Sequence, residues 1–208
     1  MDGYLTKNEM KEIVFATNNP HKLEEVRRIA GDSFVIKGLS DIGCHDDIPE
    51  TGATLEENAF QKARWVAERY GYACFADDTG LMVDALGGEP GVYTARYAGS
   101  ACDPDANMNL LLERLRGCAD RSARFTTVIA FKDGDREYAF TGTAEGSIAL
   151  ERHGTEGFGY DPVFISADSG KCFAEMGPDE KNAVSHRGRA LALFTEFLKK
   201  YDNTKEIW

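Results

Sequence analysis

The chain has 208 residues, of which 42% are hydrophobic and 28% charged, as in a globular protein with one domain, and its formal net charge is −11. This acidic balance argues against a nucleic-acid polymer as partner, since no basic field would attract the phosphate backbone, although a small anion needs only a local cationic pocket. Five cysteines without C-x-x-C spacing, no signal peptide and no long apolar run predict reduced thiols, no membrane partner and a cytoplasmic location.

The N-terminal segment, residues 1–10, is polar and has no hydrophobic periodicity. We therefore expect a disordered extension there, followed by a single domain over residues 11–201. A short apolar strand is predicted over Ile13–Thr17. The helix that follows would have Asn19 at its N-cap and Pro20 as its first residue, which are favoured positions for these two residue types.

The loop between this strand and helix, Asn18–Lys22, is a candidate anion site. Free backbone N–H groups and the positive end of the helix dipole would face the loop, and Lys22 would favour a bound anion there. The loop lacks the glycines of a P-loop. Because an ordinary strand–helix connection is the commoner alternative, this segment alone is a weak indication of phosphate binding.

A second helix is predicted after Thr54, with a capping box between Thr54 and Glu57 and an amphipathic repeat that runs to a stop at Gly71. Asn58 and Lys62 are four residues apart, so they project from one face of this helix. The helix would therefore present an amide and a cation side by side.

The stretch that follows the helix carries two adjacent acids, Asp77 and Asp78, between the apolar runs 73–76 and 81–83. A buried carboxylate is costly unless it is paired or metal-bound, so the pair suggests an ion or a cationic ligand. Asp-Asp-Thr-Gly also suits a polar turn between two strands, and the two interpretations are level. With Glu50 ahead of the helix, three converging carboxylates would suit a hard metal ion that carries a phosphate chain.

Further along, Arg96 is a possible phosphate or dimer contact, and an exposed surface arginine is an equal alternative. A helix is predicted from Asp103, with core residues on one face. An antiparallel ribbon is predicted from the strand-like segments 125–131 and 138–148, because a Lys-Asp-Gly-Asp turn signal separates them.

The segment Gly157–Phe164 alternates glycines with aromatic residues. Glycine lets the backbone approach a flat ligand, while Phe158 or Tyr160 could stack on it and Asp161 could accept a hydrogen bond from a base. An aromatic core turn is the alternative.

A polar loop is predicted over Glu175–Asn182, and the last helix is predicted to begin after Ser185 as N-cap. Lys181, His186 and Arg187 lie at or near this helix start, where the dipole favours acids. Because local rules are broken at functional sites, we interpret these three residues as a grip on phosphate or on a base oxygen, in preference to a surface basic cluster.

Taken together, these motifs are similar to those of the inosine/xanthosine triphosphate pyrophosphatases, which remove deaminated purine nucleotides. The similarity covers about residues 11–200 and rests on six stretches in the same order: Thr17–Lys22, Glu50–Gly52, Glu57–Ala59, Ala76–Leu81, Phe158–Pro162 and Ser185–Gly188.

The resemblance implies an α/β fold, with an elongated mixed β-sheet flanked by helices and two lobes around a central active-site cleft. It also implies a homodimer and Mg²⁺-dependent hydrolysis of ITP, dITP and XTP to the monophosphate and pyrophosphate.

The resemblance assigns a role to each matching position. Asp78 would be the catalytic base, and Glu50 and Asp78 the Mg²⁺ ligands. Thr79 matches a substrate contact that is often serine. The expected substrate-binding residues are Thr17, Asn18, Asn19, Pro20, His21, Lys22, Lys62, Thr79, Phe158, Gly159, Tyr160, Asp161, Lys181, His186 and Arg187.

Two other functions stay open at this point. One is a nucleotide-sensing module without turnover, although a sensor needs no acid in the position of a base. The other is a pyrophosphatase of related fold that acts on modified pyrimidine nucleotides.

Overall fold

The computed structural model describes residues 12–30 and 34–201, so the extension expected at residues 1–10 lies outside the described part of the chain. Within these ranges the β-strands form one seven-stranded sheet. The strands are β1 (Glu12–Phe15), β2 (Val35–Lys37), β3 (Cys74–Val83), β4 (Pro90–Gly91), β5 (Ser122–Asp133), β6 (Arg136–Ile148) and β7 (Phe164–Ser166). The α-helices are α1 (Pro20–Ala30), α2 (Leu55–Tyr70), α3 (Pro104–Arg114), α4 (Pro178–Val184) and α5 (His186–Tyr201).

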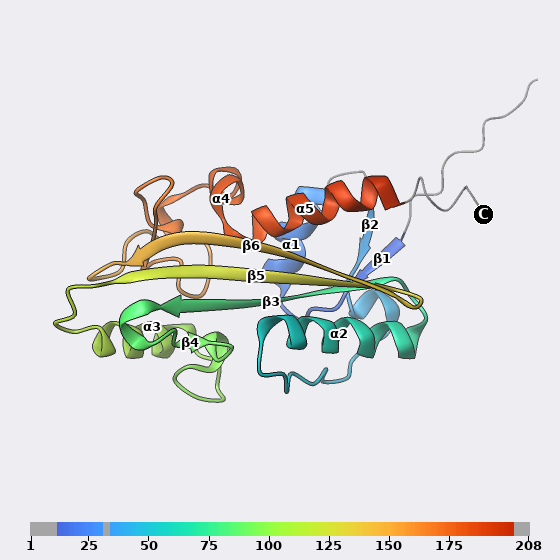
Figure 1. Ribbon diagram of the computed structural model, residues 1–208, viewed down its shortest axis with the longest axis horizontal. Helices are drawn as coiled ribbons and strands as arrows, with labels where there is room; N and C mark the ends of the chain where they lie inside the picture. The colour runs from blue at the N-terminus through green and yellow to red at the C-terminus, as the bar shows by residue number, and fades with distance from the viewer. Residues whose placement is uncertain (1–11, 31–33, 202–208) are drawn as a thin grey trace, which may run out of the picture.

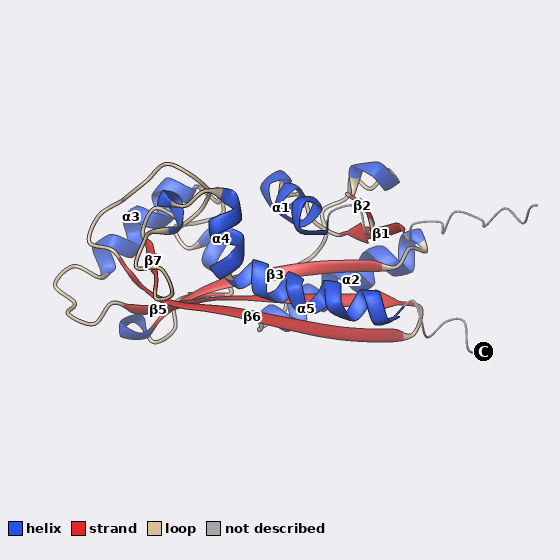
Figure 2. Cartoon of the chain, turned by 90° about the horizontal axis from the view of Figure 1, so that it is seen from above, coloured by secondary structure: helices blue, strands red, loops and turns tan. Residues whose placement is uncertain are grey.

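The sheet is mixed, in the order β2-β1-β3-β5-β6-β7, with β4 paired to β3. β1 runs parallel to both β2 and β3, whereas the pairs made by β5, β6 and β7 are antiparallel. The long strands β3, β5 and β6 extend through most of the molecule and give it an elongated shape (Figures 1 and 2). The predicted class, an elongated mixed sheet flanked by helices, is confirmed.

At one end of the long strands, α2 covers one face of the sheet and α5 covers the other, with α1 beside α5 (Figure 1). Alternation along the strands supplies both cores, because successive side chains point to opposite faces. Thus Ile13 and Phe15 pack in the core with α5, whereas Val14 packs in the core with α2. A third core, with Leu81 and Phe125, fills the other end of the sheet.

The helix boundaries follow the local signals in the sequence. Thr54 caps α2, and both hydrogen bonds of the predicted capping box to Glu57 are present. Asn19 Oδ1 accepts the N–H groups of His21 and Lys22 at the start of α1, as its N-cap prediction requires. Each such cap contributes about 1 kcal/mol to helix stability.

One local prediction is wrong. The segment Glu175–Asn182 was expected to be a polar loop, but the short helix α4 occupies Pro178–Val184, with Pro178 in its first turn. With seven residues, this helix is too short for an amphipathic repeat to be recognised in the sequence. Its charged residues also favoured the prediction of a polar loop. The helix places Lys181 in the protein interior, where the residue is 6% exposed.

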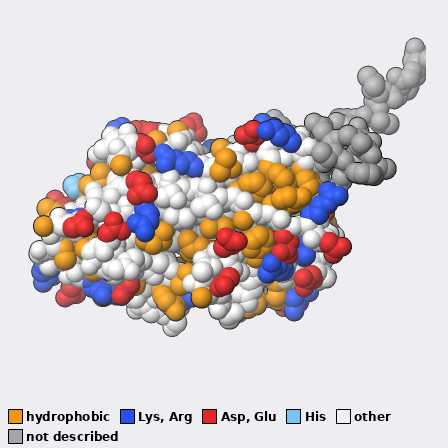
Figure 3. All heavy atoms as spheres, viewed as in Figure 1, with side chains coloured by type: hydrophobic (Ala, Val, Ile, Leu, Met, Phe, Trp, Pro, Cys, Tyr) orange, Lys and Arg blue, Asp and Glu red, His pale blue; other side chains and the backbone are white. Residues whose placement is uncertain are grey.

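A group of hydrophobic side chains lies on the surface formed by α5 and β6. Figure 3 shows them gathered on the viewed face where α5 lies beside β6. Leu193 of α5 is 50% exposed, while Tyr138, Phe140 and Phe197 are partly buried against the underlying core. No helix in the described part of the chain is long and apolar enough to cross a membrane.

Candidate active site

A cleft of about 510 Å³ opens at the middle of β3. β1 pairs with β3 as far as Phe75, and β4 pairs with it from Leu81, so residues 76–80 lie between the two pairings. The cleft therefore reaches side chains on both faces of the sheet. The expected site residues that line it are Thr17, Asn18, Asn19, His21, Lys22, Glu50, Lys62, Asp78, Thr79, Phe158, Gly159, Tyr160, Asp161, Lys181, His186 and Arg187.

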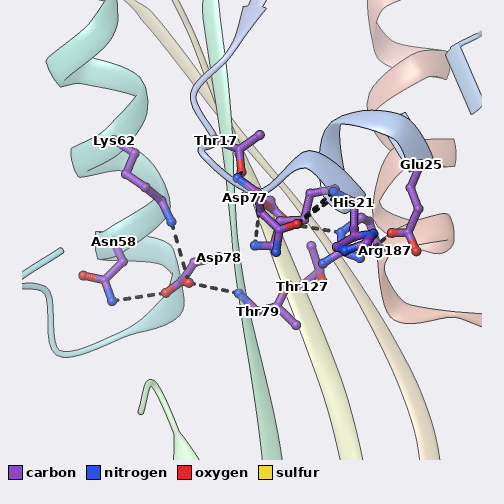
Figure 4. A network of polar contacts seen from close by, with 12 residues as sticks. Thr17, His21, Glu25, Asn58, Lys62, Asp77, Asp78, Thr79, Thr127 and Arg187 are labelled. Atoms are coloured by element: carbon purple, nitrogen blue, oxygen red, sulfur yellow. Dashed lines mark hydrogen bonds and ion pairs between the residues drawn. The ribbon is translucent and has the colours of Figure 1, made fainter. Parts of the chain in front are cut away.

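The two central acids do not form a turn. β3 is continuous from Cys74 to Val83, and Asp77 and Asp78 pair in register with Ile129 and Val128 of β5. Because side chains alternate along a strand, Asp77 lies on the face of the α5 core and Asp78 on the face of α2. The turn interpretation is wrong, and the two carboxylates belong to two separate clusters (Figure 4).

Asp78 is held by residues of α2 and by its own strand. Its Oδ2 accepts a hydrogen bond from Asn58 Nδ2 at 3.1 Å, and its Oδ1 accepts one from the N–H of Thr79 at 3.1 Å. Lys62 Nζ lies 3.7 Å from Asp78 Oδ1 and 2.5 Å from Glu50 Oε1. Burial raises the pKa of Asp78, and this shift outweighs the opposing effect of Lys62.

The expectation of three converging carboxylates is wrong. Asp77 faces away from Asp78, and within residues 12–30 and 34–201 no three His, Cys, Asp or Glu side chains are grouped closely enough to hold an ion alone. Glu50 and Asp78 remain together, and a cation, the ammonium of Lys62, already lies between them. The two carboxylates carry one more unit of charge than the ammonium neutralises. The remaining negative charge suits a hard cation, which prefers oxygen ligands.

Asp77 lies in a buried charge cluster on the other face. Its carboxylate is 2.9 Å from Lys22 Nζ and 3.1 Å from Arg187 Nε, and the residue is 2% exposed. Burial alone would raise the pKa of Asp77, but Lys22 and Arg187 outweigh it and hold that pKa well below its usual range. Burial lowers the pKa of Lys22 although Asp77 opposes the shift.

Glu25 of α1 extends this cluster and was missed in the sequence. It lies 2.5 Å from Arg187 Nη1 and 3.3 Å from Lys181 Nζ, and Lys181 in turn lies 2.8 Å from Asp161. The signal was available, because Glu25 is three residues after Lys22 and so shares its face of the helix. Of the three residues predicted to grip a ligand, Lys181 and Arg187 are thus held in place by the carboxylates of Asp77, Glu25 and Asp161.

The start of α5 is fixed by close packing on β6. A Cβ atom at Gly142 of β6 would overlap the carbonyl oxygen of His186, so only glycine allows this approach. Ser185 Oγ accepts the N–H of Gly188, as an N-cap should. His186 is buried, its ring stacks on Phe125 at 4.5 Å, and its Nδ1 has no hydrogen-bond partner among the described residues.

A pair of hydroxyl groups follows Asp78 in β3, on the face of the sheet that carries Asp77. Thr79 Oγ1 is 2.7 Å from Thr127 Oγ1 of β5, and Thr127 is fully buried behind Thr79. Thr79 lines the cleft, and its hydroxyl is bonded to that of Thr127 behind it. Thr127 was not predicted, since only the register of β3 and β5 brings the two residues together.

The aromatic residues after β6 divide into two roles. Tyr160 is 4% exposed, packs in the core with Phe164, and donates its hydroxyl to the carbonyl of Thr94 at 2.9 Å. Phe158 is more accessible, and its ring stacks on that of His21. Of the two rings considered for stacking on a flat ligand, Phe158 is therefore the more accessible one.

The model of the Ham1 family matches residues 13–197, nearly the whole described chain, including every element of this cleft. The chain belongs to the Ham1 family. It is 52% identical over 190 residues to the dITP/XTP pyrophosphatase of Porphyromonas gingivalis, covering 91% of this chain and 98% of that protein. The dITP/XTP pyrophosphatase of Bacillus subtilis is 44% identical over 194 residues, covering 91% and 98%.

Solved structures of Ham1 proteins have the same fold. The structure of the Ham1 protein from Staphylococcus aureus superimposes with a TM-score of 0.84 at 40% identity, covering 92% of this chain and all of the other. The Ham1 protein from Coxiella burnetii gives 0.85 at 39% identity, with the same coverage. The family resemblance inferred from the motifs is confirmed.

Proposed function

We propose that this protein hydrolyses non-standard purine nucleoside triphosphates, dITP, ITP and XTP, to the nucleoside monophosphate and pyrophosphate. The observation that carries the proposal is the carboxylate of Asp78, fixed by Asn58 and Lys62 at the middle of a cationic cleft. Relatives that match this chain over nine-tenths of its length bear the name dITP/XTP pyrophosphatase. Such a reaction would remove deaminated purines from the nucleotide pool.

Asp78 is the residue that accepts the proton of the attacking water. A general base must lie within reach of the nucleophile, and its pKa should approach the working pH. Burial moves the pKa of Asp78 upward, in the direction that strengthens it as a base. Asn58 orients the carboxylate by its hydrogen bond to Oδ2.

Glu50 and Asp78 would hold Mg²⁺. The pair fits the ion, because both offer carboxylate oxygens and together exceed the charge of Lys62. When bound there, the ion neutralises phosphate charge and lowers the pKa of a coordinated water. Removing divalent ions with EDTA should therefore abolish hydrolysis, and adding Mg²⁺ should raise the melting temperature of the wild type more than that of Glu50→Gln.

The phosphate chain would bind between α1 and α2. The backbone N–H groups at the start of α1 and the side chains of Thr17 and Asn18 border the cleft on one side. Lys22 and Lys62 bring positive charge from the two faces of β3. These cations stabilise the charge that develops on the departing pyrophosphate.

The base would bind between Phe158 and the start of α5. Arg187 carries more N–H donors than its contacts with Asp77 and Glu25 use. His186 Nδ1, which has no hydrogen-bond partner within residues 12–30 and 34–201, is a second polar group that a ligand could satisfy. Donors suit the 6-keto oxygen of hypoxanthine or xanthine and meet the 6-amino group of adenine unfavourably, so the site would reject dATP.

A substrate panel with Mg²⁺ tests this function. Pyrophosphate release should be rapid with dITP and XTP and slow with dATP. Rapid release from dUTP instead would indicate a pyrimidine enzyme. Binding of dITP without any release would indicate a nucleotide sensor.

The proposal also includes a cytoplasmic location, a homodimer and a single domain. All five cysteines are free thiols, as a reducing compartment such as the cytoplasm requires. The proposed homodimer would show twice the monomer mass by light scattering. The proposed single domain over residues 11–201 would unfold in one cooperative transition.

A further inference from the structure

His21 lies in the predicted phosphate loop, but its side chain does not point toward the phosphate end of the cleft. The backbone N–H of His21 is held by Asn19 Oδ1 at 3.0 Å. Its imidazole stacks on the ring of Phe158, with the ring centroids 5.4 Å apart and the planes 17° from parallel. Phe158 belongs to the segment after β6, so the contact joins two walls of the cleft that are far apart in the sequence.

The side chain of Lys22, the next residue, points in a different direction from that of His21. Lys22 reaches β3, where its ammonium pairs with Asp77 at 2.9 Å. Successive residues in an α-helix point in directions about 100° apart. In the first turn of α1, the ammonium of Lys22 thus lies at the centre of the site, whereas the ring of His21 lies at the end of the cleft that contains Phe158. Figure 4 shows His21 near Arg187, away from Asp78.

Phe158, the partner of His21, is surrounded by the groups proposed to read the base. Lys181 Nζ lies 4.9 Å from its ring centroid and Arg187 Cζ lies 5.5 Å from it. Both His21 and Phe158 line the main cleft, and both also line a smaller cavity of about 150 Å³. The stacked rings therefore form a partition that ends the main cleft on this side.

We propose that His21 takes part in base binding: its imidazole stacks on one face of the Phe158 ring and holds that ring in place, and the purine packs against the exposed side of this stacked pair. This inference rests on the proposed function and reassigns His21 from the phosphate chain to the base. A purine is flat and aromatic, and ring stacking favours flat partners in offset arrangements. The role needs an aromatic ring at position 21 and needs no charge there.

Three variants test the assignment: His21→Ala, His21→Phe and, as a matched control, His153→Ala. His153 is exposed, does not line the cleft, and serves to show what loss of a surface histidine does by itself. Three quantities are measured with Mg²⁺ present: KM for dITP, the dissociation constant of dIMP, and the inhibition constant of inorganic tripolyphosphate, which has no base. Melting temperatures confirm that each variant is folded.

We expect His21→Ala to raise KM for dITP and the dissociation constant of dIMP about three- to tenfold. Inhibition by tripolyphosphate should not change, because that probe has nothing to stack. His21→Phe should restore wild-type values, and His153→Ala should leave all three unchanged.

Two results would overturn the assignment. If His21→Ala weakens tripolyphosphate as much as dITP, and His21→Phe does not restore either, His21 binds phosphate. If His21→Ala changes none of the constants, the stacked pair has no part in binding. Failure of the wild type to hydrolyse dITP would contradict the proposed function alone, since dIMP and tripolyphosphate binding are measured without turnover.

Discussion

Asp77 and Asp78 are consecutive residues of one β-strand, yet their carboxylates lie in different charge clusters on opposite faces of the sheet. Asp78 contacts Asn58 and Lys62 of α2, whereas Asp77 pairs with Lys22 of α1 and Arg187 of α5. The strand thereby separates the acid that can accept a proton from the acid that holds the cations. The two residues should respond differently to the same substitution.

Asp78→Asn should lower the rate of dITP hydrolysis by about 10²–10⁴-fold, because the variant loses its general base. It should remain as stable as the wild type, since burial disfavours the charged form of Asp78 and raises its pKa. The rate is followed as pyrophosphate release and stability as melting temperature. A variant that retains more than about a tenth of the activity would remove Asp78 from the mechanism.

Asp77→Asn should instead destabilise the fold by about 3–5 kcal/mol, the usual cost of removing one partner from a buried ion pair. Lys22 and Arg187 would then lie buried with one negative charge fewer. Denaturant unfolding measures the loss. An unfolding free energy equal to that of the wild type would show that water or Glu25 compensates the two cations.

Glu25→Gln should make stability less dependent on acid pH. Burial alone would raise the pKa of Glu25, but Arg187 and Lys181 outweigh it and lower that pKa. A lowered pKa in the folded state adds stability above the pKa of the unfolded chain, about 4.3, and this stability is lost as pH falls through the folded value. The gap in unfolding free energy between wild type and variant should therefore be large at pH 7 and shrink below about pH 4.

Glu24→Gln is the matched control for this measurement. Glu24 is the adjacent acid on α1, its side chain is 70% exposed, and its partner is Arg28 one turn along the helix. Exposed pairs of this kind contribute about 0–1 kcal/mol. A gap as large for Glu24→Gln as for Glu25→Gln would show that the net charge of α1, and not the buried cluster, sets the pH dependence.

Thr127→Val should weaken substrate binding although Thr127 is buried behind the cleft. Valine has the same shape but cannot bond to Thr79 Oγ1, so the Thr79 hydroxyl loses the partner that orients it. One hydrogen bond of this kind corresponds to about 0.5–1.5 kcal/mol, and we expect KM for dITP to rise about two- to tenfold at nearly constant kcat. Thr127→Ser restores the hydroxyl and should restore KM; equal KM values in both variants would assign Thr127 to packing alone.

Much of the fold could be predicted because its signals are local. The capping box between Thr54 and Glu57 marks the start of α2 within the residues that form it. The turn signal near Gly134 likewise places the β5–β6 hairpin, although both strands extend beyond the predicted segments. In contrast, α4 has only seven residues, and no hydrophobic repeat in its sequence marks it as a helix.

The arrangement of the site could be predicted only in part, because its contacts join residues far apart in the chain. Composition and order identified both acids of β3, but the sequence Asp-Asp-Thr-Gly is equally typical of a turn. Only the pairing of β3 with β5 makes the strand continuous and sends the two carboxylates to opposite faces. Thr127 was missed for the same reason, since it contacts Thr79 only through the pairing of two strands. For Glu25 the spacing from Lys22 was a local signal, but its partners Arg187 and Lys181 lie far along the chain.

The identity of the products from dITP tests the central claim most directly. Wild-type protein is incubated with dITP and Mg²⁺, and the products are separated by ion-exchange chromatography. Attack between the α and β phosphates predicts dIMP and pyrophosphate in equal amounts, with no dIDP at any time. Formation of dIDP and inorganic phosphate, or an unchanged pool of dITP, would contradict the account.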